Sequence, residues 1–215
     1  MNLMEEYKSK LVSADKAVKV IKSGDWIDYG EFCGQVRDLD RALAKRKDEL
    51  KDVKIWSTVN PYPTAVNAVD PTGESFVWHS WHMSGADRAI AKTGKPVYYS
   101  PIKYSELPRY IRERIEPLDV AMIQVTPMNR HGFFNFGPQC SFTRAVCDRA
   151  KVVIVEVNQE QPRCRGGYEE AIHISEVDYI VEGSNQPLAI VPSPPATNVD
   201  KKVAELILDE ISDGC

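Results

Sequence analysis

Four short segments that we expect to be loops, residues 29–31, 60–63, 79–85 and 129–139, concentrate small, polar and aromatic residues, the types that bind and orient small molecules. Each follows an apolar run short enough to be a strand, and loops of this kind line ligand pockets in α/β proteins. From loop position alone, we expect the following residues to face a substrate-binding pocket: Tyr29, Gly30, Glu31, Asn60, His79, His82, Gly132, Asn135, Gly137 and Gln139.

Glu31 is the most chemically suggestive of these residues. A carboxylate at the end of a strand can act as a general acid or base, or as a nucleophile. A glutamate in a loop more often forms a salt bridge or is simply solvated. The sequence therefore favours the ordinary role for Glu31 and leaves the chemical role open.

His79 and His82 lie three residues apart, so a helical turn would present both imidazoles to a metal ion or an anion. No third ligand is near them in sequence, and we expect packed histidines and no metal site. The five cysteines are scattered and form no C-x-x-C pair, which favours reduced, structural thiols. Cys140 and Cys147 are seven residues apart on one face of an expected helix, which indicates core packing.

Each of two glycine-containing turns allows two interpretations. His131-Gly132 is either a simple tight turn or a turn that also contacts a ligand. Residues 163–167, Arg-Cys-Arg-Gly-Gly, form either an anion-binding nest or a solvated hairpin. Motifs for nucleotide hydrolysis, dinucleotide binding, zinc proteolysis and serine hydrolysis are missing, which argues against those activities.

The elements that must position these loops alternate along the chain. Residues 120–125 form an apolar run typical of a buried parallel strand, residues 141–150 indicate a helix, and residues 151–158 indicate a second buried strand. Strand, loop, helix and strand make a βαβ unit. Further strands are expected at 25–30, 53–59, 75–78 and 96–99, with helices at 14–21, 36–50, 86–92 and 105–112. The fold class is therefore α/β, with an open, mostly parallel sheet flanked by helices.

Composition restricts the class of protein. The chain has 215 residues and is 43% hydrophobic, enough to bury one full core. Its net charge of -4 gives no basic footprint for nucleic acid. The first residues contain acidic side chains and no apolar signal region, and no apolar run reaches membrane-spanning length. We expect a soluble cytoplasmic protein that binds neither nucleic acid nor membrane.

The last thirty residues have a different character. A proline-rich turn at 191–200 leads into a helix that Asn198 or Asp200 can cap. Its apolar residues Val203, Leu206 and Ile207 mark a face that needs a partner. We expect residues 1–215 to form one domain, whose last part, residues 185–215, links it to a following catalytic domain. We also expect the exposed helix face to promote homo-oligomers. A fragment of a longer chain and a split enzyme both remain open.

Longer strings carry a family resemblance. FVWHSWHMSGADR, VYYSPIKYSELPRYIR, DVAMIQVTPMNRHGFFNFGP, KVVIVEVNQEQPRCRGGYEEAIHISEVDYIVEG and PATNVDKKVAELILDEISDG resemble the N-terminal half of the acetyl-CoA hydrolase/transferase family. The resemblance covers essentially the whole chain. Within the family, the likeness is strongest to 4-hydroxybutyrate and butyrate:acetate CoA-transferases.

The resemblance implies a two-domain enzyme with a CoA-transferase fold in each half. In such enzymes a glutamate of the second half attacks the acyl-CoA carbonyl to give an acyl-glutamyl anhydride. The returning CoA thiolate then forms a glutamyl-CoA thioester, and the acceptor carboxylate reverses the exchange. The resemblance thus implies that coenzyme A is a substrate and that no cofactor is tightly bound. The partners would be acyl-CoA and a short-chain carboxylate, and no catalytic residue would lie in this chain.

Two other functions stay open. In a hydrolase of the same family, water would intercept the glutamyl intermediate. A non-catalytic CoA-binding or assembly module would act only by association. Acetyl, butyryl and 4-hydroxybutyryl groups differ by contacts worth about 1–3 kcal/mol, so the sequence does not choose among them.

Overall fold

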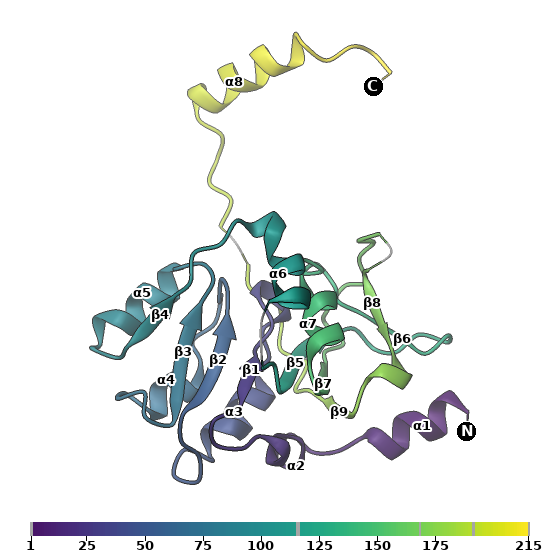
Figure 1. Cartoon of the computed structure of the whole chain (residues 1–215). Coiled ribbons are helices and arrows are strands. Elements are labelled where there is room, and N and C mark those ends of the chain that lie inside the picture. The colour runs from purple at the N-terminus through teal and green to yellow at the C-terminus, as the bar shows by residue number, and fades with distance from the viewer. Residues whose placement is uncertain (1, 115–116, 168, 191, 215) are drawn as a thin grey trace.

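The computed structural model describes residues 2–114, 117–167, 169–190 and 192–214 as an α/β fold built on one large parallel sheet (Figure 1). The seven strands of this sheet, in the spatial order β4-β3-β2-β1-β5-β7-β9, all run parallel. Their bounds are β1 Trp26–Asp28, β2 Val53–Ser57, β3 Phe76–Ser80, β4 Val97–Tyr99, β5 Val120–Val125, β7 Val152–Val157 and β9 Tyr179–Glu182. This confirms the predicted fold class.

Eight α-helices and a small antiparallel pair of strands complete the described part of the chain. The helices are α1 Leu3–Lys10, α2 Ala14–Ala17, α3 Asp38–Ala44, α4 Ala65–Val69, α5 Gly85–Lys92, α6 Leu107–Glu113, α7 Thr143–Arg149 and α8 Asn198–Leu208. The pair consists of β6 Phe133–Asn135 and β8 Ala171–His173. Together these elements cover the sheet on both faces and extend it with a small lobe.

Each face of the sheet carries its own hydrophobic core. On one face, Ile27, Ile55 and Met122 of the strands pack with Leu39 and Leu43 of α3. On the other, the strands pack with Ile111 of α6, Val146 of α7 and Phe134 of β6, among others. All six residues of β5 are buried because helices cover both of its faces, which explains its unbroken apolar sequence.

Local signals at helix ends agree with the structure, with one correction. Ser84 caps α5, and its hydroxyl accepts a hydrogen bond from the backbone N–H of Asp87. The expected caps of the last helix were wrong. Thr197 is the N-cap of α8, and Asp200 occupies the third helical position of the same capping box. A threonine in extended conformation there satisfies the free N–H groups better than Asn198, which is already helical.

Four elements differ from the sequence-based prediction. Helices α1 and α4 were not predicted, because they are short and their apolar residues show little periodicity. Strand β6 lies inside the segment 129–139 that was expected to be loop throughout. Strand β3 continues to Ser80, so His79 belongs to the sheet and not to the loop after it.

Helix α8 stands apart from the body of the domain (Figure 1). Its apolar residues Val203, Leu206 and Ile207 are 50–58% exposed, as the prediction of an unpartnered face required. No helix in the described ranges is long and apolar enough to cross a membrane.

Candidate active-site edge at the carboxyl ends of the strands

The sheet has a topological switch point between β1 and β5. From β1 the chain builds outward through β2, β3 and β4, whereas β5, β7 and β9 extend the sheet in the other direction. The two central strands pair in parallel, with Ile27 opposite Val120. The loops that leave their carboxyl ends must therefore diverge, and the crevice between such loops is where open α/β sheets bind ligands.

The loop after β1 is tightly folded at this switch point. Gly30 has a φ of +66°, and a Cβ at this position would lie 2.3 Å from the carbonyl oxygen of Gly34. Only glycine fits that turn. Gln35 then exchanges hydrogen bonds with the backbone of Tyr62, with its Nε2 3.2 Å from the carbonyl oxygen and its Oε1 3.4 Å from the amide nitrogen. The loops after β1 and β2 are thus held together.

Two carboxyl groups are buried at this point. Glu31 is 1% exposed and Asp28, the last residue of β1, is 4% exposed. Burial raises the pKa of each group to about 7, and the proximity of Asp28 contributes to the shift at Glu31. Asp28 accepts one hydrogen bond, at 2.9 Å from the backbone N–H of Gly30. Raised carboxyl pKa values are frequent at sites that hold or move a proton.

The carboxyl oxygens of Glu31 have no well-formed hydrogen bond within the described part of the chain. Ser141, Gln139 and the backbone of Phe142 are near enough to favour its charged form, but burial outweighs them. The hydroxyl of Ser141 is also hydrogen-bonded to that of Tyr104. Tyr104 is 54% exposed, so this group of side chains connects the buried carboxyl to the surface.

Asn135 holds together the loops that follow β5 and β7. This side chain is fully buried, and its Nδ2 donates to the carbonyl oxygen of Cys164 at 2.8 Å. Its Oδ1 accepts from the amides of Cys164 and Gly137 at 3.0 and 2.9 Å. A Cβ at Gly137 would lie 2.6 Å from the side chain of Gln161, and one at Gly132 would lie 2.6 Å from His173. A side chain at Gly132 or Gly137 would therefore clash, and the glycines allow the loops to pack this closely.

The remaining expected site residues lie elsewhere. Tyr29 is fully buried in the core, with its hydroxyl 3.1 Å from Asp40. His79 stacks among Trp26, Trp56 and Tyr98 on one face of the sheet, and burial lowers its pKa to about 4. His82 is exposed in the loop after β3. The two imidazoles therefore do not form a common site.

The structure thus brings together part of the expected set and adds to it. Gly30, Glu31 and Gln139 gather at the switch point, and Asn60 lies in the adjoining loop after β2. Sequence reasoning missed Asp28, Tyr104 and Ser141. Asp28 could have been found, because it is a polar residue at the carboxyl end of a central strand. Tyr104 comes from a distant turn, and nothing local to it indicated this position.

No cluster of metal-ligating side chains occurs among residues that the structure describes. Cys33, Cys140 and Cys164 are half-buried and free, and Cys147 is buried and free. Burial raises the pKa of Cys33 and Cys140 further from neutrality, so these thiols are poor nucleophiles as they stand.

Comparison with known proteins gives consistent matches. Residues 1–192 match the model of the acetyl-CoA hydrolase/transferase N-terminal domain. Over its full length, the chain is 50% identical to a butyryl-CoA:acetate CoA-transferase from Anaerostipes caccae, of which it covers 48%. It is 34% identical to a 4-hydroxybutyrate coenzyme A transferase from Clostridium kluyveri, with 100% of the chain and 49% of that protein covered.

A solved structure has the same fold. RipA from Yersinia pestis superposes with a TM-score of 0.87 and 29% identity, covering 100% of this chain and 51% of that chain. The chain therefore spans about half the length of the relatives it matches. It belongs to the acetyl-CoA hydrolase/transferase family and corresponds to the N-terminal domain of that family.

Proposed function

We propose that this chain is the N-terminal part of a CoA-transferase that moves CoA between a short-chain acyl-CoA, butyryl or 4-hydroxybutyryl, and acetate. The observation that carries the proposal is the 50% identity to the butyryl-CoA:acetate enzyme along the whole chain. The switch point is a second support, because open α/β sheets generally bind ligands there and because Asp28 and Glu31, whose pKa values are raised, lie at it.

The reaction divides between two domains in this proposal. The nucleophilic glutamate belongs to a C-terminal domain, and its carboxylate displaces the CoA thiolate from the acyl-CoA to form an anhydride. The thiolate then attacks the glutamyl carbonyl and releases the first carboxylate. The acceptor carboxylate runs these two steps in reverse, so that the new acyl-CoA forms and the glutamate is regenerated. The N-terminal domain forms the opposite wall of the crevice and keeps water from the anhydride intermediate. We place Gly30, Glu31 and Gln139 on this wall.

Glu31 acts in the proposal as a positioning residue. Its carboxyl is buried behind Gln139 and Ser141, which are themselves only half-buried. A protonated Glu31 can donate a hydrogen bond without repelling a substrate carboxylate, whereas a charged one would repel it. A carboxyl with a pKa of about 7 is thus suited to a site that takes up an anion and releases it again.

A transfer assay tests the function. The domain joined to its C-terminal counterpart is supplied with acetyl-CoA and butyrate, and butyryl-CoA is separated by chromatography. We expect transfer by the two-domain protein, none by this chain alone, and a CoA adduct only on peptides of the C-terminal domain. Release of acetate without an acceptor, at a rate equal to transfer, would identify a hydrolase. No gain when the domains are combined would identify an association module.

Gln139→Ala tests the site within that assay. Removing the half-buried amide should raise KM for the carboxylate about tenfold and leave kcat within about twofold, because one hydrogen bond to a charged group is worth about 1.5–3 kcal/mol. Glu74→Ala, at an exposed position before β3 and so at the opposite edge of the sheet, is the control. Equal kinetics for the two variants would remove Gln139 from the binding wall.

A further inference from the structure

The segment that follows β9 crosses the carboxyl edge of the sheet. At its start, the amide of Gly183 donates to the carbonyl oxygen of Val157, at the end of β7, at 2.9 Å. At its end, the amide of Ala189 donates to the hydroxyl of Tyr62, in the loop after β2, at 2.6 Å. Strands β7 and β2 lie on opposite sides of the switch point, with β5 and β1 between them. Residues 183–189, the strap, therefore span the switch point.

The strap is bonded to the domain between its ends as well, although it contains neither helix nor strand. The amide and the hydroxyl of Ser184 donate to Oδ2 of Asp38, at the start of α3, at 2.7 and 2.8 Å. The carbonyl oxygen of Gln186 accepts from Nδ2 of Asn158, a buried side chain just beyond β7, at 2.9 Å. Ordering an irregular segment costs conformational entropy, which such bonds offset. The strap is thus a fixed part of the domain.

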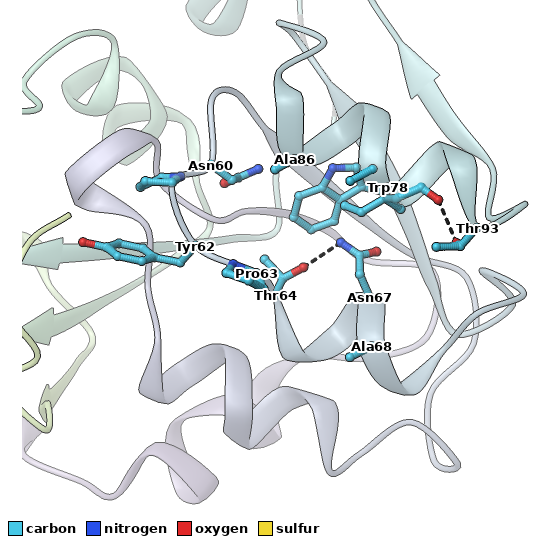
Figure 2. Close-up of a pocket in the computed structure, with 12 residues that line it drawn as sticks. Asn60, Tyr62, Pro63, Thr64, Asn67, Ala68, Trp78, Ala86 and Thr93 are labelled. Carbon is cyan, nitrogen blue, oxygen red and sulfur yellow. Dashed lines mark hydrogen bonds between the residues drawn. The ribbon is translucent and has the colours of Figure 1, made fainter. Parts of the chain in front are cut away.

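Arg37 and Tyr62 hold the far end of the strap. Arg37 donates from a terminal guanidinium nitrogen to the carbonyl oxygen of Pro187 at 3.3 Å, and its guanidinium carbon lies 4.3 Å from the centre of the Tyr62 ring. This cation–π contact orients the ring. Figure 2 shows that the Tyr62 hydroxyl points away from Trp78, and so away from the cavity that both residues line. The hydroxyl is thereby placed to accept the bond from Ala189.

Tyr62 also connects the strap to the candidate site. Its backbone amide and carbonyl are bonded to the side chain of Gln35, in the loop after β1. In the same loop, the carbonyl oxygen of Glu31 accepts from the amide of Gly34 at 2.7 Å. Tyr62 is therefore bonded through its backbone to the loop that carries Glu31, and through its hydroxyl to the strap.

We propose that Tyr62 and Arg37 are positioning residues, which fix the direction in which the chain leaves Ala189 relative to Glu31 and Gln139. The inference rests on the proposed function, in which the chain beyond the strap leads to the domain that carries the nucleophile. The nucleophile and the bound substrate must meet within narrow limits, and a small misplacement costs a large factor in rate. A strap tied on both sides of the switch point sets that geometry, whereas a free tether leaves it open.

Amide hydrogen exchange in the 215-residue chain tests the strap itself. We expect the amide of Ala189 to exchange at least tenfold more slowly than in an unstructured peptide of the same sequence. Tyr62→Phe keeps the ring that stacks on Arg37 but removes the acceptor, so exchange at Ala189 should become about fivefold faster, the factor that one hydrogen bond supplies. Tyr98→Phe is the control, because it removes an exposed hydroxyl from β4, at the edge of the sheet. An unprotected Ala189 in wild type, or equal exchange in the two variants, would overturn the proposal.

The kinetics of the two-domain protein test the positioning role. Tyr62→Phe should lower kcat about fivefold and change KM for acetyl-CoA and butyrate less than twofold, because the binding groups stay and only the productive arrangement becomes rarer. Arg37→Lys keeps the charge but loses the planar stacking, and it should lower kcat in the same way. Tyr98→Phe should change neither constant, and urea midpoints check that each variant is folded. An unchanged kcat in folded Tyr62→Phe, or a raised KM without a loss of kcat, would contradict the positioning role.

The failure of this inference and that of the proposed function can be told apart. Transfer at the same kcat in wild type and Tyr62→Phe would reject the inference and leave the proposed function intact. No transfer by the wild-type two-domain protein would reject the function and the positioning role with it, and exchange at Ala189 would still show whether the strap is fixed.

Discussion

Glu31 and Glu156 are two glutamates with the same 1% exposure on either side of the switch point, and they differ in what surrounds their oxygens. Glu156, on β7, accepts hydrogen bonds from the backbone amides of Arg37, Asp38 and Leu39 at 2.8–3.0 Å and from Gln124 at 3.2 Å. Glu31 has no bond of comparable quality within the described residues. Burial by itself therefore does not mark a functional carboxylate.

The contrast has a physical basis. Glu156 faces the first turn of α3, where free N–H groups and the positive end of the helix dipole favour an anion. Burial raises its pKa, and these donors oppose the increase. Glu31 meets the same burial, but its neighbours Ser141, Gln139 and the backbone of Phe142 form no hydrogen bond to it as good as those at Glu156. The first group is part of the architecture, and we propose that the second acts on a ligand.

The largest expected effect comes from Glu156→Gln. The substitution keeps the shape but turns an NH2 group toward backbone N–H donors, which should lower the free energy of unfolding by about 3–5 kcal/mol. Urea denaturation at pH 7 measures the change. Glu74→Gln, at an exposed position, is the control and should stay within about 0.5 kcal/mol. A loss at Glu156 as small as that of the control would contradict its structural role.

Glu31→Gln should act in the opposite direction. The pKa of Glu31 is about 7 in the folded chain against an ordinary value of 4.5, so between these pH values the folded state holds a proton that the unfolded state has released. Stability from this group is therefore lost as pH rises through the window, and the cost is complete above pH 7. The neutral amide removes that cost and should stabilise the chain by about 2–3 kcal/mol at pH 8.

The pH dependence separates this effect from a general change in packing. Below pH 4 both states of wild type are protonated, and Glu31→Gln should be nearly neutral. Urea midpoints at pH 4, 6 and 8 for both proteins supply the comparison, and Asp28 is unchanged in both. A variant that is less stable than wild type at pH 8 would show that the charged form of Glu31 is well satisfied, like Glu156.

The sequence was sufficient to predict the fold, but not the difference between the surroundings of Glu31 and Glu156. Strands such as β5 were predicted to the residue, because parallel strands buried on both faces are continuous apolar runs. Glu31 was predicted as a site candidate, yet the surroundings of neither glutamate could be predicted from the neighbouring sequence. The donors around Glu156 come from residues 37–39, about 120 positions away, and Tyr104 reaches the other site from an unrelated turn. Side chains assembled by tertiary packing leave no periodic signal.

The smallest expected effect tests the surroundings of Glu31. Tyr104 donates or accepts a hydrogen bond with Ser141 at a half-exposed position, so Tyr104→Phe should cost only about 0.5–1 kcal/mol of stability. Tyr99→Phe, at 53% exposure, controls for loss of a surface hydroxyl. If Tyr104→Phe costs more than about 2 kcal/mol, the network around Glu31 is structural in the same sense as that around Glu156. A small loss of stability, together with a raised KM for the carboxylate in the two-domain protein, would instead indicate that Tyr104 and Ser141 act on a ligand.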